Sequence, residues 1–235
     1  MKTEHISSAF DTDLEEVQAL IMKMGGLVEN AIHQGMQSLE TRDEELAQTV
    51  RAADAEIDAL EETINEGAAR IIALRAPTAI DLRLVLSVIK ISGNLERIGD
   101  YAKNMAKRTE VLSQAAPISD STGTLRRMTR AVEGMLKDAL DAYIHRDVAL
   151  AADVIARDVD VDQMYNALFR ELLTFMMEDP RNITASLHLH FIAKNTERMG
   201  DHVTSIAEQV VYLATGKHPD EARPKADTTA TAGQA

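Results

Sequence analysis

The chain has 235 residues, a formal net charge of −13, 45% hydrophobic residues and no cysteine. A chain of this length has room for one or two domains with real cores, while the lack of cysteine excludes disulfides, thiolate metal sites and a cysteine nucleophile. The acidic charge argues against a nucleic-acid partner and suits cations. The N-terminus has no apolar signal core and no apolar run approaches the ~20 residues that span a bilayer, so we expect a protein that is neither exported nor membrane-embedded.

Helical signals fill the first half of the chain. Aromatic residues make up only 3% of the sequence, and the abundance of Ala, Leu, Glu, Arg and Met favours helix. A capping box of Thr12 and Glu15 predicts where the first helix begins, and Thr41 with Glu44 predicts the start of the second. Pro77 ends the second helix because proline lacks a backbone donor, and a third helix follows.

The helical pattern then starts again after residues 115–124, a small and polar stretch that we predict to be a linker. Three further helices are expected, at about residues 125–145, 147–178 and 183–215. Pro180 separates the last two, and Gly216 stops the last one. We expect the tail, residues 217–235, to be disordered.

The two halves form a tandem repeat. Arg42-Asp43 recurs as Arg146-Asp147, and the segment 94–100 recurs as 195–201. The sequence therefore predicts an all-α fold with two pseudo-symmetric antiparallel three-helix bundles, built from six long helices. The bundles cover residues 1–114 and 125–216.

Pairs of acids spaced four positions apart are the main candidates for chemistry, because that spacing puts both carboxylates on one helix face. Asp54 falls in the apolar stripe of Val50 and Ile57, where aspartate needs a partner. An antiparallel helix that carries Glu96 and Asp100 would bring further carboxylates to it. The predicted set over both repeats is Asp54, Asp58, Glu96, Asp100, Asp158, Asp162, Glu197 and Asp201.

Four carboxylates together are strongly unfavourable unless they are protonated or neutralised. Hard ions such as Mg²⁺, Mn²⁺, Ca²⁺ or ferric iron suit carboxylate oxygens, and bridging carboxylates permit a multinuclear cluster. Arg97 and Arg198 each follow the motif's Glu. They are candidates for donating hydrogen bonds that orient the metal-binding carboxylates. The competing interpretation is that these acids pair with Arg and Lys across the helices. Gly99 and Gly200, each inside a helix, suggest a close approach to the backbone.

Catalytic residues are not predicted, because the sequence has no recognisable Ser/His/Asp constellation, phosphate-cradling loop or nucleotide fingerprint. His188 and His190 break the repeat and are not assigned as ligands, whereas His202 is a candidate accessory ligand. The alternative function is a multinuclear-metal carboxylate enzyme or a metal-storage helical protein. Di-iron carboxylate proteins need Glu-x-x-His, and here Gly99 and Gly200 stand in the histidine's place.

Several short segments carry a family resemblance across residues 4–216. They include His5-Ile6-Ser7, Met24-Gly25-Gly26, Arg70-Ile71-Ile72-Ala73, Pro77-Thr78-Ala79, Asp81-Leu82-Arg83, Met176-Met177-Glu178-Asp179 and both Glu-Arg-x-Gly-Asp motifs. In this tandem layout the chain resembles the PhoU family, regulators associated with bacterial high-affinity phosphate transport. The family's metal motif, an acid followed four positions later by Asp, falls on the eight acids above. Met199 stands where the family usually has Ile.

The resemblance implies a negative regulator of the phosphate-starvation response, not an enzyme, that controls phosphate uptake and homeostasis. It would be cytoplasmic and reach the membrane only through its partners. Those partners would be the PstB-like ATPase of the phosphate ABC transporter and a PhoR-like sensor histidine kinase, whose signal-off state it would favour when phosphate is plentiful. Family members bind Mg, Mn, Fe or Zn and often form homodimers.

Overall fold

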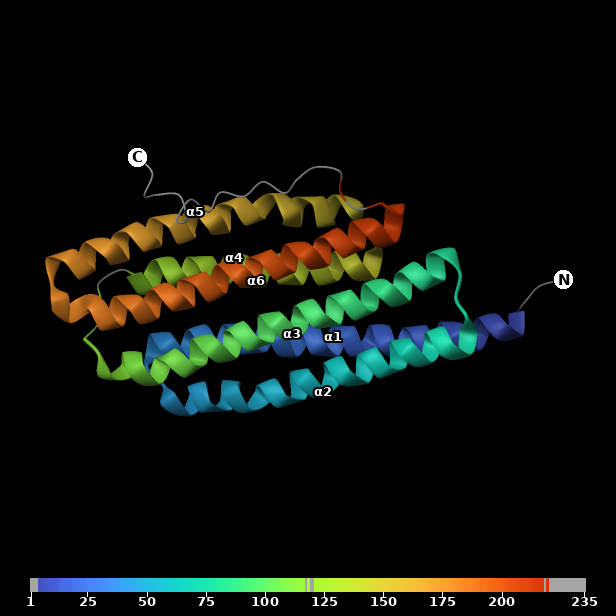
Figure 1. Cartoon of the computed structure of the whole chain (residues 1–235), viewed down its shortest axis with the longest axis horizontal. Helices are drawn as coiled ribbons and strands as arrows, with labels where there is room; N and C mark the ends of the chain where they lie inside the picture. Colours follow the sequence, from blue (N-terminus) through green and yellow to red (C-terminus); the bar gives the residue numbers. More distant parts are fainter. Residues whose placement is uncertain (1–3, 117, 119–120, 218, 220–235) are drawn as a thin grey trace.

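The computed structural model describes residues 4–116, 118, 121–217 and 219. Within this part of the chain, six long α-helices and one short 3-10 helix account for all the regular structure, and there is no strand. The helices are α1 (Glu4–Thr41), α2 (Glu44–Arg75), α3 (Ala79–Gln114), α4 (Ser121–His145), α5 (Val148–Glu178), η1 (Pro180–Asn182) and α6 (Ile183–Thr215). The predicted all-α architecture of two three-helix bundles is confirmed (Figure 1).

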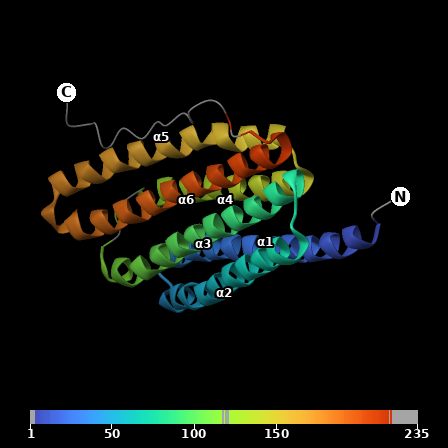
Figure 2. The same cartoon turned by 45° about the vertical axis from the view of Figure 1, so that its right-hand side comes forward.

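The two bundles lie side by side with their long axes roughly aligned. Helices α1 to α3 form one bundle and α4 to α6 the other, and the turned view of Figure 2 shows the same arrangement. Equivalent helices join the bundles, since α3 packs along α6 and α1 packs against α4. Both pairs run antiparallel, as Figure 1 shows for α3 and α6. The repeat in the sequence is therefore a pseudo-twofold repeat in space.

The turn after the first helix is the same in both repeats. Arg42 and Arg146 adopt left-handed backbone conformations, with φ of 56° and 51°. Asp43 then caps α2 by accepting a hydrogen bond of 2.9 Å from the backbone N–H of Leu46, and Asp147 caps α5 in the same way. The predicted capping box of Thr41 and Glu44 is therefore wrong, because Thr41 still belongs to α1 and the aspartate two residues later reaches the free N–H groups.

Two other helix starts differ from the prediction. Helix α1 begins at Glu4 and runs through Thr12, so the capping box at Thr12 does not start it. Phe10 packs on the core, and such packing outweighs a capping signal of about 1 kcal/mol. Helix α4 begins at Ser121, four residues before the predicted start, and the buried Ser121 hydroxyl donates to the carbonyl of Ile118.

The end of α6 follows the prediction. Gly216 has φ of 76°, and its N–H donates to the carbonyl of Tyr212 over 2.8 Å. Only glycine adopts this conformation without strain, which is why it stops the helix here. The prediction of a disordered tail falls almost wholly on residues outside the described part of the chain.

Candidate cation site

Helices α2 and α3 carry the four predicted acids of the first repeat. Asp54 is 4% exposed, as its place in the apolar stripe predicts. The side chains of Glu96 and Asp100 on α3 are 17% and 32% exposed, whereas Asp58 lies at the exposed edge of α2. The seam between α2 and α3 thus runs from a buried carboxylate to solvent-facing ones.

The charges of these acids influence one another. Loss of hydration raises the pKa of Asp58, and the negative charges of Asp54 and Asp100 raise it further. Loss of hydration also raises the pKa of Glu96, and Asp100 and Asp58 add to that rise. The structure therefore brings the four predicted acids of the first repeat into one electrostatic cluster.

A fifth acid, Glu61, belongs to the same cluster and was not predicted. It lies on α2 three residues after Asp58, and its charge raises the pKa of both Asp58 and Glu96. Its spacing from Asp58 was a usable signal, because residues three apart share a helix face. The equivalent residue in the second repeat is Tyr165, so a comparison of the two halves does not identify Glu61 as a candidate.

Lys103 supplies a positive charge inside the first cluster, and it too was not predicted. Its ammonium forms an ion pair with Asp54 and lies 3.4 Å from Oδ1 of Asp100. The hydrogen bond to Asp54 raises the pKa of Lys103, which therefore stays charged. The spacing of three residues from Asp100 could have predicted the contact of Lys103, because residues three apart share a helix face.

The two arginines of the motifs lie on the surface. Arg97, 59% exposed, approaches Oε2 of Glu96 at 3.3 Å and Oδ2 of Asp100 at 3.7 Å. This contact fits the predicted orienting role, although exposed ion pairs contribute little to stability. Arg198 is exposed; burial lowers the pKa of His202, and the positive charges of Arg97 and Arg198 lower it further. A role for Arg198 in orienting carboxylates stays a prediction.

The second repeat buries its acids more deeply. Asp158, Asp162 and Glu197 are 1%, 3% and 5% exposed, and Asp201 is half-buried. Nζ of Lys194 lies 2.9 Å from Oε2 of Glu197. Buried carboxylates on facing helices carry a large desolvation cost, so this seam depends on positive charge more than the first does.

The glycines of the motifs let the helices approach closely. A Cβ atom at Gly200 would stand 3.0 Å from Oδ1 of Asp158, so that carboxylate lies against the α6 backbone. A Cβ atom at Gly99 would stand 3.0 Å from Cδ1 of Ile57. Both glycines therefore serve the packing of the seam, as their position inside a helix suggested.

Whether these carboxylates can bind a metal ion depends on Lys103 and Lys194, which contact them. Among the residues that the structure describes, no three acidic or histidine side chains form a ready-made metal site. The donor set is nevertheless that of a hard cation, with only carboxylate oxygens in a partly buried seam. Lys103 holds two of these carboxylates and Lys194 holds another. A metal ion at these oxygens would have to displace the ammonium groups, and metal binding stays a prediction.

Both repeats match a known domain. The family model described as PhoU domain covers residues 21–109 and 125–210, one stretch in each bundle. The chain belongs to the PhoU family. The matched residues include both acid seams, whereas the tail lies outside them.

Relatives in the PhoU family match nearly the whole chain. The phosphate-specific transport system accessory protein PhoU homolog of Caulobacter vibrioides is 46% identical over 225 residues, which are 96% of this chain and 98% of that protein. The homolog of Zymomonas mobilis subsp. mobilis is 48% identical over 229 residues, with coverage of 97% and 96%.

Solved PhoU structures have the same fold. The crystal structure of PhoU from Pseudomonas aeruginosa is 40% identical with a TM-score of 0.85, and the match covers 88% of this chain and all of that one. PhoU from Streptococcus pneumoniae is 28% identical with a TM-score of 0.83 and covers 90% of this chain. In the described part of the chain, no helix combines the length and apolar character needed to cross a bilayer.

His202 and His190 contact other side chains at the α3–α6 seam and in the second bundle. Nδ1 of His202 lies 2.8 Å from Oδ1 of Asn94, and its ring lies 5.7 Å from that of Tyr101. His190 packs among Tyr165, Phe169 and Phe191. Both histidines thus pack between helices here, and the role of His202 as an accessory ligand stays a prediction.

His188 provides a test of the electrostatics at this seam. Its Nδ1 lies 3.3 Å from Nη1 of Arg108, and burial together with the Arg108 charge lowers its pKa below 6.5. A lowered histidine pKa means that the unfolded chain takes up the proton first, so this contribution to stability is lost as the pH falls below 6.5. We expect Arg108→Gln to raise the pKa of His188 toward 6.5, measured by NMR titration of the ring protons. Arg70→Gln, at the far end of the bundle, is the control; an unchanged pKa in Arg108→Gln would contradict the assignment.

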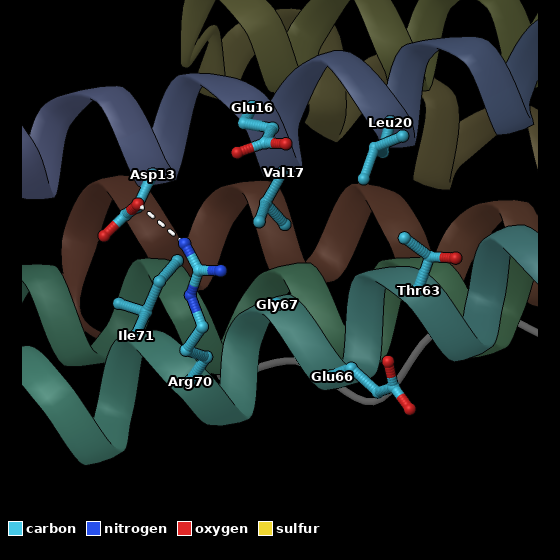
Figure 3. Close-up of a pocket in the computed structure, with 9 residues that line it drawn as sticks. All are labelled: Asp13, Glu16, Val17, Leu20, Thr63, Glu66, Gly67, Arg70 and Ile71. Atoms are coloured by element: carbon cyan, nitrogen blue, oxygen red, sulfur yellow. Dashed lines mark hydrogen bonds and ion pairs between the residues drawn. The ribbon is translucent and has the colours of Figure 1, made fainter.

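A separate hollow lies between α1 and α2, away from the acid clusters. Figure 3 shows Arg70 reaching across it to Asp13, and Nη2 of Arg70 lies 3.3 Å from Oδ1 of Asp13. Arg75 also binds Asp13 and lowers the pKa of that carboxyl. The hollow holds about 230 Å³ and is lined by Asp13, Glu16, Val17, Leu20, Thr63, Glu66, Gly67, Arg70 and Ile71. Two of its lining residues, Asp13 and Arg70, form an ion pair between α1 and α2, so the hollow lies where these helices are tied together.

Proposed function

We propose that the protein is a cation-binding adaptor that regulates phosphate transport and acts as a negative regulator of the phosphate-starvation response. One observation carries this proposal: the PhoU domain matches both repeats, and relatives 46% and 48% identical over nearly the whole chain are named phosphate-specific transport system accessory proteins. The match extends beyond the core to both acid seams, so the feature that defines the candidate site lies within it.

The proposed partners are proteins on the cytoplasmic side of the membrane. We assign the chain to the cytoplasm as a homodimer that contacts a PhoR-like sensor histidine kinase and the PstB-like ATPase of the phosphate ABC transporter. Exposed large apolar side chains on α3 and α6 are our candidates for contacts with these partners. They are Ile80, Leu86, Val111, Ile183, Leu187 and Phe191.

The cation would act inside the adaptor. Mg, Mn, Fe or Zn, held by the carboxylates of each seam, would supply positive charge that links α2 to α3 and α5 to α6. The carboxylates in question are Asp54, Asp58, Glu96, Asp100, Asp158, Asp162, Glu197 and Asp201. Rigid bundles fixed in this way suit a protein that presents a surface to partners. We assign no catalysed reaction, and reproducible oxidase or phosphatase turnover by the purified protein would revive the enzyme alternative.

A gene deletion tests the regulatory role. In the organism that encodes the protein, we expect the deletion to switch on phosphate-starvation genes even at high phosphate, because the kinase loses the adaptor that favours its off state. A transcriptional reporter measured at high and low phosphate gives the readout, and a plasmid copy of the gene should restore repression. A deletion strain whose reporter stays repressed at high phosphate and responds normally to starvation would rule out this role.

A further inference from the structure

The first half of α6 presents a stripe of apolar side chains to solvent. Ile183, Leu187 and Phe191 are spaced four residues apart, so they lie along one face of the helix, and all three are exposed. The end of α3 lies beside this part of α6 and adds the exposed Val111 (Figure 1). Exposed apolar side chains that gather on one face mark interaction sites, whereas single ones do not.

Arg108 of α3 lies against this stripe. The central carbon of its guanidinium is 4.4 Å from the centre of the Phe191 ring, which is a cation–π contact. Its Nη1 lies 3.3 Å from Nδ1 of His188, and its buried Nε has no hydrogen-bond partner. Because arginine can only donate, His188 accepts through Nδ1 as a neutral ring. The positive charge of Arg108 is therefore held at the edge of an apolar surface.

Within the described residues, Arg108 forms no ion pair with a carboxylate. Glu110, the nearest acid along α3, pairs with Arg51 at 2.6 Å. Burial lowers the pKa of Arg108, and no neighbouring negative charge offsets that effect. A partly desolvated cation without a counter-ion is costly, and it is unexpected in a chain with a net charge of −13. This charge is thus available to a carboxylate from another molecule.

The first repeat lacks this combination at the equivalent place, which lies at the opposite end of the α3–α6 pair. Gln209 corresponds there to Arg108, and Lys90 corresponds to Phe191. An uncharged amide and a lysine therefore stand where the second bundle has an arginine on an aromatic ring. The pseudo-twofold repeat thus carries this surface at one end only.

We propose that the stripe of Ile183, Leu187 and Phe191, together with Arg108, is a docking site for a segment of a partner protein that carries apolar side chains and a carboxylate. The apolar side chains would cover the stripe, and the carboxylate would pair with Arg108. Aromatic and arginine side chains commonly dominate the affinity of protein interfaces, and charge complementarity selects the partner. This inference rests on the adaptor role in the proposed function and adds which surface docks and what chemistry the partner presents there.

Surface variants test the docking site against the two proposed partners. The probes are the purified cytoplasmic part of the PhoR-like kinase and the PstB-like ATPase of the same organism, and biolayer interferometry measures their affinity. We expect Leu187→Glu to weaken binding of at least one probe by at least about tenfold, because a charge would lie against the partner's apolar side chains. Leu86→Glu is the matched control. Leu86 is the equivalent residue of the first repeat, 40% exposed against 42% for Leu187, and its variant should bind as the unmodified protein does.

Arg108→Gln tests the carboxylate of the partner. We expect this variant to bind the same probe about tenfold more weakly and to lose part of the salt dependence of binding between about 0.05 M and about 0.3 M NaCl, because salt screens an ion pair. Arg70→Gln removes the same charge at the far end of the bundle and should change neither quantity. An unchanged affinity or an unchanged salt dependence in Arg108→Gln would show that no carboxylate docks on Arg108. Circular dichroism melting curves verify that each variant is folded.

The outcomes separate this inference from the proposed function. If the unmodified protein binds a probe and Leu187→Glu binds it equally well, or Leu86→Glu loses as much affinity, the docking site is wrong while the adaptor role stands. If the unmodified protein binds neither probe, the partner assignment fails and the inference fails with it. If light scattering shows that Leu187→Glu converts a dimer into a monomer, a second copy covers the stripe and the inference is wrong.

Discussion

Gly200→Val is expected to lower the free energy of unfolding by about 1–3 kcal/mol, the usual cost of forcing extra atoms into a closed core. A Cβ atom at this position would stand 3.0 Å from Oδ1 of Asp158 and 3.6 Å from Cγ1 of Val161. Asp158 is only 1% exposed, so its carboxylate has little space into which it can move. Urea denaturation followed by circular dichroism gives the measurement.

The same substitution at Gly134 is the matched control. Gly134 lies inside α4 of the same repeat, and a Cβ atom there would meet nothing within 4 Å. Because valine has a slightly better helix propensity than glycine, we expect Gly134→Val to be neutral or slightly stabilising. Equal losses of stability in the two variants would show that close approach at the acid seam is not the reason for Gly200.

Neutralising two buried acids of the second repeat is expected to have the largest effect on binding. Asp162→Asn combined with Glu197→Gln should weaken Mn²⁺ binding by more than roughly 100-fold, because each lost charge removes about 2 kcal/mol of attraction to a divalent ion at 4 Å even at the dielectric constant of water. Isothermal calorimetry at fixed ionic strength measures this loss.

A control with the same change in net charge separates local from general electrostatics. Asp160 and Glu178 are exposed acids on α5, and Asp160→Asn with Glu178→Gln should leave Mn²⁺ affinity nearly unchanged because exposed charges are screened by salt. If both double variants bind Mn²⁺ equally well, the buried acids of the second repeat are not the ligands.

The positions of the helices along the chain were predictable because local sequence signals determine them. Apolar spacing placed all six helices, and the breaks at Pro77, Pro180 and Gly216 lie where the structure has helix ends. Helix starts were less predictable, since the cap at Asp43 competes with the nearby Thr41, a residue of similar capping ability.

The candidate site was predictable only in the part that the two repeats share. The burial of Asp54 followed from its position between Val50 and Ile57 on the helical wheel. Glu61 and Lys103 were not predicted because the equivalent residues in the second repeat are Tyr165 and Thr204. The comparison of the two halves therefore did not single them out. The antiparallel packing of α3 on α6 is a long-range contact that local periodicity does not encode.

The most direct test of the acid seams as cation sites is the metal content of the protein purified without added metal and without a metal-affinity resin. Elemental analysis should find a bound divalent or trivalent metal, and the Asp162→Asn and Glu197→Gln double variant should contain less of it. A metal-free protein whose melting temperature does not respond to Mn²⁺ or Mg²⁺ would contradict the account. The acids would then be held by lysine and arginine alone.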